Sequence, residues 1–236
     1  MPNTARIYAV GVGPGDPELI TRKGERIIRS AKVICAPTGA ADAASYALSI
    51  VGELVDPCRQ EILTQTFPMM KTGAELEAAW EDAASQVIER IDRGYDVVFI
   101  TIGDPLLYST FLYIRRIIQQ RRPDIPMEIV PGISSVSAAA AAAGVPLGIA
   151  GDRIAILPAT YEDYELRRTL KEFDTVVLMK VSRVFDRVYA ILQELGLTGK
   201  GVFVRRVGSD QEEVVRDIST LLGRELDYLS MLIVKK

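Results

Sequence analysis

Short apolar segments alternate with helical patterns along the whole sequence, and this alternation constrains the fold more than any other feature. In the first half, the apolar segments predict strands at residues 6–12, 32–37, 96–105 and 127–132. Helices are expected at residues 19–30, 41–51, 73–93, 106–122 and 137–144. The strands are apolar throughout, which is typical of strands covered on both faces in a parallel sheet. We therefore predict a doubly wound α/β domain with a mostly parallel sheet.

The second half continues the pattern with differences. Its strands are expected at residues 152–159, 173–181, 199–207 and 227–236, with helices near residues 161–171 and 184–195. No helix follows the final strand, so we predict a mixed sheet in a second α/β domain. The predicted N-terminal domain spans residues 1–131 and the C-terminal domain spans residues 132–236.

The composition argues against several classes of function. The chain has 236 residues, of which 48% are hydrophobic and 25% charged, as is usual for a soluble globular protein. Its net charge of −3 provides no basic field for nucleic acid or a membrane surface. Residues 1–6 lack the apolar core of a signal peptide, and no apolar segment reaches membrane length. We expect a cytoplasmic protein whose two cysteines, Cys35 and Cys58, are reduced thiols.

The chain contains no histidine, and this limits the chemistry that it can perform. Histidine is the commonest general base and the commonest metal ligand in proteins. The two cysteines lie far apart and outside any metal-binding spacing. We therefore expect no metal site, and a reaction that does not need histidine as its base.

Three of the expected strands end in turns that contain glycine. These turns are GVGPGD (residues 11–16), GDPLLYST (residues 103–110) and PGISS (residues 131–135). Glycine allows a sharp turn or a close backbone approach. In an open parallel sheet, ligands bind beyond the carboxyl ends of the strands. We expect the three turns to converge on one ligand cleft.

The first turn differs from a dinucleotide-binding turn. Its glycines give the pattern G-x-G-x-G, and Asp16 stands where the third glycine of a dinucleotide motif is expected. Pro14 has no amide hydrogen to offer a phosphate, and the carboxylate of Asp16 would repel one. A Walker lysine is also missing. A nicotinamide cofactor is therefore a poor fit.

Four motifs, in their order and spacing, resemble those of the tetrapyrrole methylases of cobalamin biosynthesis. They are GVGPGDPELIT, GDPLLYSTF, EIVPGISS and VVLMKVSR, and the resemblance covers nearly the whole chain. Other members, including uroporphyrinogen-III methylase and diphthine synthase, share the glycine–proline loop. The segments YSTFLY, PGISS before an alanine-rich helix, and MKVSR are most similar to the branch that methylates carbon 20 of precorrin-2 or cobalt-factor II.

The resemblance implies an enzyme that transfers a methyl group from S-adenosylmethionine to carbon 20 of the ring and releases S-adenosylhomocysteine. It also implies a homodimer, and a cofactor bound in a trough between the two domains. Whether the ring holds cobalt stays open. The alternatives are another tetrapyrrole methylase, a diphthine synthase that acts on a translation factor, and a tetrapyrrole carrier without activity; the lack of histidine counts against a haem-type carrier.

The resemblance assigns roles to individual residues. The implied cofactor contacts are Pro14, Ile102, Gly103, Asp104, Leu107, Ser134, Ser135, Met179, Val207 and Met231. The implied substrate contacts are Tyr108, Lys180, Arg183 and Arg206, because a polycarboxylate ring needs cations around it. Asp104 and Tyr113 are the catalytic candidates, and we expect both to position ligands more than to transfer protons.

Some of these residues have an equally simple structural interpretation. Met179 and Met231 would also suit the core of a sheet. Ser134 and Ser135 would also suit the N-terminus of the alanine-rich helix, where a hydroxyl accepts a backbone hydrogen bond. The two roles are compatible, because the N-terminus of a helix can also face a ligand.

Overall fold

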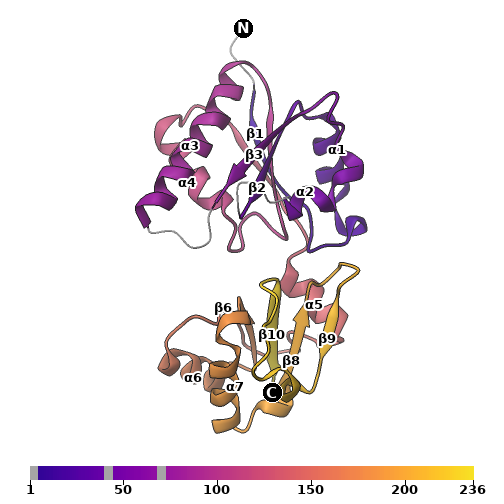
Figure 1. Ribbon diagram of the computed structural model, residues 1–236, viewed down its shortest axis with the longest axis vertical. Helices are drawn as coiled ribbons and strands as arrows, with labels where there is room; N and C mark the ends of the chain where they lie inside the picture. The colour runs from indigo at the N-terminus through magenta and orange to yellow at the C-terminus, as the bar shows by residue number, and fades with distance from the viewer. Residues whose placement is uncertain (1–4, 40–44, 68–72) are drawn as a thin grey trace. The chain divides into compact units, whose positions relative to one another are not determined.

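The computed structural model describes residues 5–39, 45–67 and 73–236 (Figure 1). The chain forms two compact units, Met1–Ser134 and Ser135–Lys236. Each unit is built around its own five-stranded sheet. Both units therefore have the α/β architecture that the sequence predicts.

The sheet of the first unit is parallel throughout and has the strand order β3-β2-β4-β1-β5. Its strands are β1 (Ile7–Gly11), β2 (Val33–Thr38), β3 (Glu61–Thr66), β4 (Val97–Thr101) and β5 (Met127–Val130). Strand β1 pairs with β4 on one side and with β5 on the other. The carboxyl ends of these three strands consequently lie side by side, and so do the turns that follow them.

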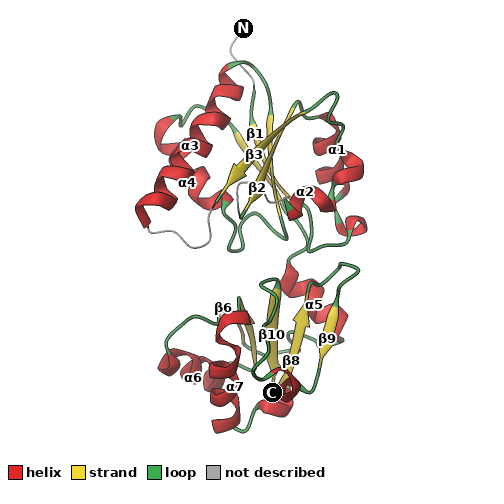
Figure 2. Cartoon of the chain, in the orientation of Figure 1, coloured by secondary structure: helices red, strands yellow, loops and turns green. Residues whose placement is uncertain are grey.

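Helices cover both faces of this sheet (Figure 2). They are α1 (Arg22–Ser30) and α2 (Tyr46–Ile50) on one face, and α3 (Gly73–Asp92) and α4 (Phe111–Arg121) on the other. Strand β4 shows why both faces are apolar: Val98 and Ile100 join the core under α1 and α2, while Val97 and Phe99 join the core under α3 and α4. The doubly wound arrangement is confirmed.

The second unit has a mixed sheet with the order β6-β7-β10-β8-β9. Its strands are β6 (Ile154–Pro158), β7 (Thr175–Met179), β8 (Gly201–Arg205), β9 (Glu213–Val215) and β10 (Ser230–Lys235). Strand β6 is parallel to β7, whereas the last strand, β10, is antiparallel to both β7 and β8. The predicted mixed sheet is confirmed, and β6, β7 and β8 point in the same direction.

Three helices pack on this second sheet. They are α5 (Ser135–Ala143), α6 (Asp163–Glu172) and α7 (Phe185–Glu194). Leu166 of α6 and Val188 of α7 share a core with Phe203 of β8. Helix α5 packs against β8 through buried alanines, as its small side chains predict. Short 3-10 helices occur at Pro17–Leu19, Gly52–Leu54, Ser182–Val184, Thr198–Lys200 and Ile218–Leu221.

The structure corrects several predicted element bounds. Strands β3 and β9 were not predicted, and both contain polar residues that weaken an apolar pattern. Helix α4 begins at Phe111, not at residue 106, because Tyr108 has a φ angle of 54° that no right-handed helix contains. Helix α1 begins at Arg22, after Thr21 accepts a hydrogen bond from Gly24 N. Residues 41–44 of the helix predicted at 41–51 lie outside the described residues.

Cys35 is buried and Cys58 is exposed, and neither forms a disulfide. Burial raises the pKa of the Cys35 thiol well above its ordinary value, so this side chain behaves as a small apolar group in the core. Within the ranges that the structure covers, no helix is both long and apolar enough to span a membrane.

Candidate functional site

The three glycine-bearing turns of the first unit meet at the carboxyl edge of its sheet. Gly103 N donates a hydrogen bond to Gly13 O at 2.7 Å, and the two residues form an antiparallel bridge. Gly132 N donates to the Asp104 carboxylate at 3.1 Å, which joins the turn after β5 to the turn after β4. The predicted convergence of the turns is therefore observed, and direct bonds between the turns maintain it.

Close backbone contact explains the glycines. A Cβ atom on Gly11 or on Gly132 would lie under 3.0 Å from the Gly103 carbonyl oxygen, a separation that real Cβ atoms essentially never show. Gly103 itself has a φ angle of 67°, in the left-handed region that residues with a Cβ atom rarely adopt. A side chain at Gly11 or Gly132 would push the turns apart, and one at Gly103 would strain its left-handed backbone.

The Asp104 carboxylate is shared by two of the turns. Its Oδ1 accepts a hydrogen bond from Leu106 N at 2.8 Å, and its Oδ2 accepts one from Gly132 N at 3.1 Å. Each carboxylate oxygen thus holds a backbone amide of a different turn. This geometry supports a positioning role for Asp104, because a carboxylate bound in this way stabilises the shape of the edge.

The same edge is poorly suited to phosphate. The Gly103 and Gly132 amides are occupied by Gly13 O and by Asp104, and Pro14 is buried and has no N–H. The Asp16 carboxylate accepts a hydrogen bond from Glu18 N at 2.8 Å and adds negative charge to the loop. Phosphate sites in Gly-rich loops need free amides. The loops therefore fit a cofactor without phosphate groups.

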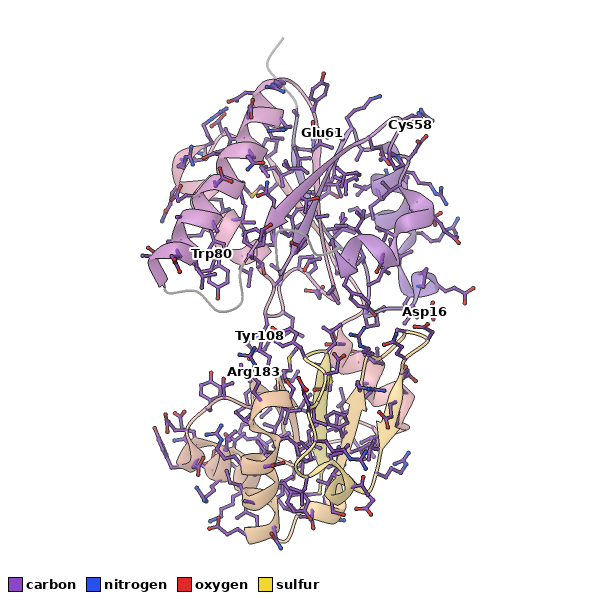
Figure 3. All side chains as sticks on the ribbon, in the orientation of Figure 1. Asp16, Cys58, Glu61, Trp80, Tyr108 and Arg183 are labelled. Atoms are coloured by element: carbon purple, nitrogen blue, oxygen red, sulfur yellow. The ribbon has the colours of Figure 1, made fainter. Side chains whose placement is uncertain are left out.

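A buried pair of hydroxyl groups, which was not predicted from the sequence, shapes the segment between β4 and α4. Thr101 Oγ1 and Ser109 Oγ lie 3.0 Å apart, and Ser109 Oγ accepts a hydrogen bond from Phe111 N at 3.2 Å. These bonds fix the residue before Ser109, which is Tyr108. Its backbone is left-handed and its side chain is 44% exposed (Figure 3). The sequence feature that could have indicated this pair is Ser109, because serine is common just before the start of a helix.

Tyr113, the other catalytic candidate, lies in the first turn of α4. Its ring is stacked on Trp80 of α3, with centroids 4.1 Å apart and an interplanar angle of 1°. The side chain is 45% exposed. The stack holds the ring without help from the hydroxyl group, and this supports an orienting role for Tyr113. Trp80 is not predictable as part of a site from the sequence, since a single tryptophan in a helix has no distinctive pattern.

The other predicted cofactor contacts of the first unit lie near the same turns. Ile102 directly follows β4 and packs against the core under α1 and α2. Leu107 N donates to Asp104 O at 3.3 Å, inside the turn that Asp104 closes. Ser134, which is half-buried, directly precedes α5. Ser135 is the first residue of that helix and belongs to the second unit.

The predicted cofactor contacts of the second unit gather at one edge of its sheet. Met179 ends β7 and is the direct partner of Met231 in β10. Met231 is buried and Met179 is half-buried, so both also belong to the interior of the sheet. Val207 is buried just after β8, the strand on the other side of β10. The structure thus brings two thioethers and a valine to the edge where β7 and β8 end.

Cationic residues follow the same two strands. Lys180 directly follows β7 and Arg206 directly follows β8, while Arg183 is exposed in the next 3-10 helix (Figure 3). The φ angles of Lys180 and Arg206 are 56° and 45°. Among the described residues other than glycine, positive φ occurs also at Tyr108 and Ala150 only. Three of these four residues are predicted substrate contacts, and such backbone strain concentrates at functional sites.

Comparison with known proteins identifies the family. The sequence model of the tetrapyrrole (corrin/porphyrin) methylases matches residues 6–221. The chain belongs to this family. A cobalt-precorrin-2 C(20)-methyltransferase from Salmonella typhimurium is 35% identical over 98% of this chain and 96% of that protein. A probable cobalt-precorrin-2 C(20)-methyltransferase from Methanocaldococcus jannaschii is 33% identical over 98% of this chain and 96% of that protein.

Solved structures of tetrapyrrole methylases share the fold. A cobalt precorrin-4 methyltransferase of cobalamin biosynthesis superposes with a TM-score of 0.74 at 23% identity, over 98% of this chain and 94% of that chain. A uroporphyrin-III C-methyltransferase from Thermus thermophilus, complexed with S-adenosylhomocysteine, gives a TM-score of 0.69 at 22% identity, over 98% of both chains. The family resemblance and the fold class expected from the sequence are both confirmed.

Proposed function

We propose that this protein transfers a methyl group from S-adenosylmethionine to carbon 20 of precorrin-2 or cobalt-factor II in corrin ring biosynthesis. One observation carries the proposal: two relatives at 35% and 33% identity match almost end to end, and the names of both specify the C(20) position. A precorrin-2 C(20)-methyltransferase from Sinorhizobium is 28% identical over 97% of this chain. The higher identity to the cobalt-type relatives favours the cobalt-loaded ring.

The turns of the first unit support the choice of cofactor. The Gly103 amide donates to the Gly13 carbonyl oxygen and the Gly132 amide donates to the Asp104 carboxylate, so both donors are already used, and S-adenosylmethionine has no phosphate that would need them. We propose Pro14, Ile102, Gly103, Asp104, Leu107 and Ser134 as its contacts in the first unit, and Ser135, Met179, Val207 and Met231 as its contacts in the second. When bound, the cofactor supplies an electrophilic methyl group on a sulfonium sulfur.

The residues of this chain would then act chiefly by positioning. Asp104 would fix the conformation of two turns that contact the cofactor. The stack on Trp80 would keep the Tyr113 ring ordered for contact with the substrate. Lys180, Arg183 and Arg206 offer cations to the substrate carboxylates. Correct placement of reacting groups can supply much of the rate enhancement in a displacement reaction.

Strong acid–base catalysis is not required for this reaction. The nucleophile is an electron-rich ring carbon that behaves like an enamine carbon, and the leaving group would be the neutral thioether of S-adenosylhomocysteine. Only the later loss of a proton from carbon 20 needs a base, and a weak one suffices. A chain without histidine is suited to such a reaction.

Mass spectrometry of reaction products tests the proposal. Purified protein is incubated with S-adenosylmethionine and, in separate reactions, cobalt-factor II, metal-free precorrin-2, uroporphyrinogen III, and a translation factor that carries the diphthine precursor. We expect one methyl group on cobalt-factor II or precorrin-2 and none on the other two. Methylation of uroporphyrinogen III or of the translation factor would identify the corresponding alternative enzyme. Ring binding without any methylated product would indicate a carrier.

We further propose a homodimer, which the family resemblance implies, and a cytoplasmic location, which the reduced cysteines favour. Light scattering coupled to size-exclusion chromatography measures the mass in solution. A mass twice that of the 25.9 kDa chain supports the dimer, and a mass equal to the chain contradicts it. Fractionation of the producing cells, followed by immunoblotting, tests the compartment.

A further inference from the structure

Arg206 has an unusually constrained backbone for a residue at a strand end. Its φ angle of 45° is in the left-handed region, which is unfavourable for any residue with a Cβ atom. Arg206 N donates a hydrogen bond to Leu229 O at 2.8 Å, and Arg206 O accepts bonds from Ser209 N at 3.1 Å and Ser209 Oγ at 2.8 Å. Both backbone polar groups are thus held, and these bonds keep the strained conformation in place.

Asp227 holds the side chain of the same residue. Arg206 Nε donates a hydrogen bond to Asp227 Oδ2 at 2.6 Å, while Asp227 Oδ1 accepts one from Leu229 N at 2.8 Å. The Arg206 side chain is 30% exposed and that of Asp227 is 20% exposed. A single carboxylate therefore fixes the guanidinium group and also the segment that binds the Arg206 backbone.

The two terminal nitrogens of Arg206 remain for a ligand. Within the described ranges, Nη1 and Nη2 have no hydrogen-bond partner, since the bond to Asp227 uses Nε only. Two parallel N–H groups of a guanidinium match the two oxygens of a carboxylate. Arg206 follows β8 at the sheet edge where Lys180 follows β7, so a second cation lies at the same edge.

The preceding residue, Arg205, provides the contrast. It is the last residue of β8 and forms an ion pair with Glu213 of β9, with Nη2 and Oε2 3.1 Å apart. This pair uses a terminal nitrogen and joins two neighbouring strands. Arg205 also lacks the left-handed backbone of Arg206. The Arg205–Glu213 pair therefore links two strands of the sheet, and it is a matched control for the Arg206–Asp227 pair.

We propose that Asp227 is a positioning residue that orients Arg206 to bind a carboxylate of the tetrapyrrole substrate. This inference rests on the proposed function, because it takes the polycarboxylate ring as the ligand. Asp227 itself touches no substrate; it fixes the direction of the guanidinium group so that the Nη1 and Nη2 atoms are available together. The left-handed backbone conformation of Arg206 is strained, and we infer that it is kept because it directs this side chain toward the ligand.

Two measurements on three single variants test the inference. Cobalt-factor II is titrated into the protein without S-adenosylmethionine and followed by its absorbance spectrum, which gives a dissociation constant without turnover. Steady-state methyl transfer gives separate KM values for the ring and for S-adenosylmethionine. The variants are Asp227→Asn, which keeps an acceptor for Leu229 N, Arg206→Lys, and the control Glu213→Gln.

We expect Asp227→Asn and Arg206→Lys each to raise the dissociation constant and KM of the ring about tenfold, the effect of one lost charged hydrogen bond. KM for S-adenosylmethionine and the melting temperature should stay unchanged, and so should every parameter of Glu213→Gln. The Asp227→Asn/Arg206→Lys double variant should be no worse than either single variant, because the two residues act as one unit.

Several results would overturn the inference. Unchanged ring affinity in Asp227→Asn, beside weakened affinity in Arg206→Lys, would show that Asp227 does not position the arginine. A parallel loss of ring affinity, cofactor affinity and melting temperature in Asp227→Asn would show a merely structural role. If the wild-type protein methylates the ring and both variants match it, the inference fails while the proposed function stands. A wild-type protein that neither binds nor methylates the ring would overturn both.

Discussion

The Gly103 carbonyl oxygen occupies the space that a Cβ atom of Gly11 or Gly132 would need. The turns after β1, β4 and β5 can approach one another only because these positions lack side chains. At the scale of single residues, this absence of side chains sets the shape of the edge, and the Asp104 carboxylate then fixes it. The shape of this edge depends on packing between backbones more than on charge.

Gly132→Ala tests the packing of the turns. The added methyl group would stand under 3.0 Å from the Gly103 carbonyl oxygen, which is backbone and cannot rotate away. We expect the free energy of unfolding to fall by about 1–3 kcal/mol, as for other overpacked sites. Urea denaturation measures this loss. Gly52→Ala is the control, because nothing lies within 4 Å of its Cβ position, and it should stay within about 0.5 kcal/mol of wild type. Equal stabilities of the two variants would contradict the account.

Asp104→Ala tests the role of the shared carboxylate. The amides of Leu106 and Gly132 would lose their acceptor, at a cost commonly of about 1–3 kcal/mol where the groups are desolvated. We expect weaker binding of S-adenosylhomocysteine, by about tenfold or more, because the turns that we propose as its contacts would lose their alignment. Isothermal titration calorimetry measures the affinity. Asp16→Ala, which frees only Glu18 N in an exposed loop, serves as control, and an Asp104→Ala affinity equal to that of this control would refute the positioning role.

Sequence reasoning reached the glycine turns but not every residue that supports them. Gly103 and Asp104 stand in a recognisable motif, so their place at the edge could be predicted. The left-handed backbone of Tyr108 could not, because residues with a Cβ atom rarely adopt it and tyrosine has no special preference for it. Asp227 was missed for a different reason: its partner, Arg206, is 21 residues away, and only the pairing of β8 with β10 brings the two together.

At the scale of elements, helix α4 shows how local bonds override a helical pattern. The apolar periodicity extends back to residue 106, yet the helix begins at Phe111. The buried bond between Thr101 and Ser109, and the bond from Phe111 N to Ser109, hold the intervening segment as a turn. The delayed start places Tyr113 in the first turn of the helix, where it can stack on Trp80 of α3.

Tyr113→Phe separates orientation from acid–base catalysis. A general base is worth about a hundredfold or more in rate, and we expect a smaller decrease because the ring keeps its stack on Trp80 without the hydroxyl group. Cofactor affinity should not change. Single-turnover methyl transfer between about pH 6 and pH 9 measures the rate across the range in which general bases work best.

The control for Tyr113→Phe is Tyr95→Phe. Tyr95 has the same exposed fraction, 45%, but precedes β4 and therefore lies toward the opposite edge of the first sheet. This control should leave the rate unchanged. A decrease above a hundredfold in Tyr113→Phe, together with loss of the pH dependence, would show that Tyr113 acts as an acid or base.

For several strands, success of the sequence-based prediction followed burial. Strands β1, β2 and β4 are covered on both faces and read as apolar runs, so the sequence predicts them directly. Strand β3 lies at the edge of the first sheet, and its burial alternates along EILTQT. Strand β9 has three residues at the edge of the second sheet. Edge strands need fewer apolar residues, and their patterns are correspondingly weak.

At the scale of the whole molecule, ion pairs link segments that are far apart in sequence. Lys235 of β10 donates to Asp152 Oδ2 at 2.5 Å, and Ile149 N donates to the same oxygen at 2.9 Å. The Lys235 ammonium group, followed by the backbone bond, holds the pKa of Asp152 below its ordinary value. The pair therefore connects the last strand of the chain to the segment before β6.

This pair gives a pH-dependent contribution to stability with a definite sign. Because the folded pKa of Asp152 is depressed, the contribution is present above the unfolded value of about 3.9 and is lost as pH falls through the folded pKa. We expect Asp152→Asn to lower the melting temperature at pH 7 and to approach wild type as pH falls through the depressed pKa of Asp152.

Scanning calorimetry at several pH values measures the difference between the two proteins. Glu172→Gln is the control, because the Glu172 carboxylate is 3.8 Å from Arg168 and both side chains are exposed. It should change the melting temperature little at any pH. A deficit in Asp152→Asn that persists unchanged into acid would contradict the ion-pair account.

Methyl transfer to carbon 20 is tested most directly by locating the transferred methyl group. The protein is given cobalt-factor II and S-adenosylmethionine labelled with carbon-13 in its methyl group, and the isolated product is examined by NMR. We predict one labelled methyl group per ring, with correlations that place it at carbon 20. A labelled methyl group at any other ring carbon, or an unlabelled ring after complete incubation with both carbon-20 substrates, would contradict the proposed function.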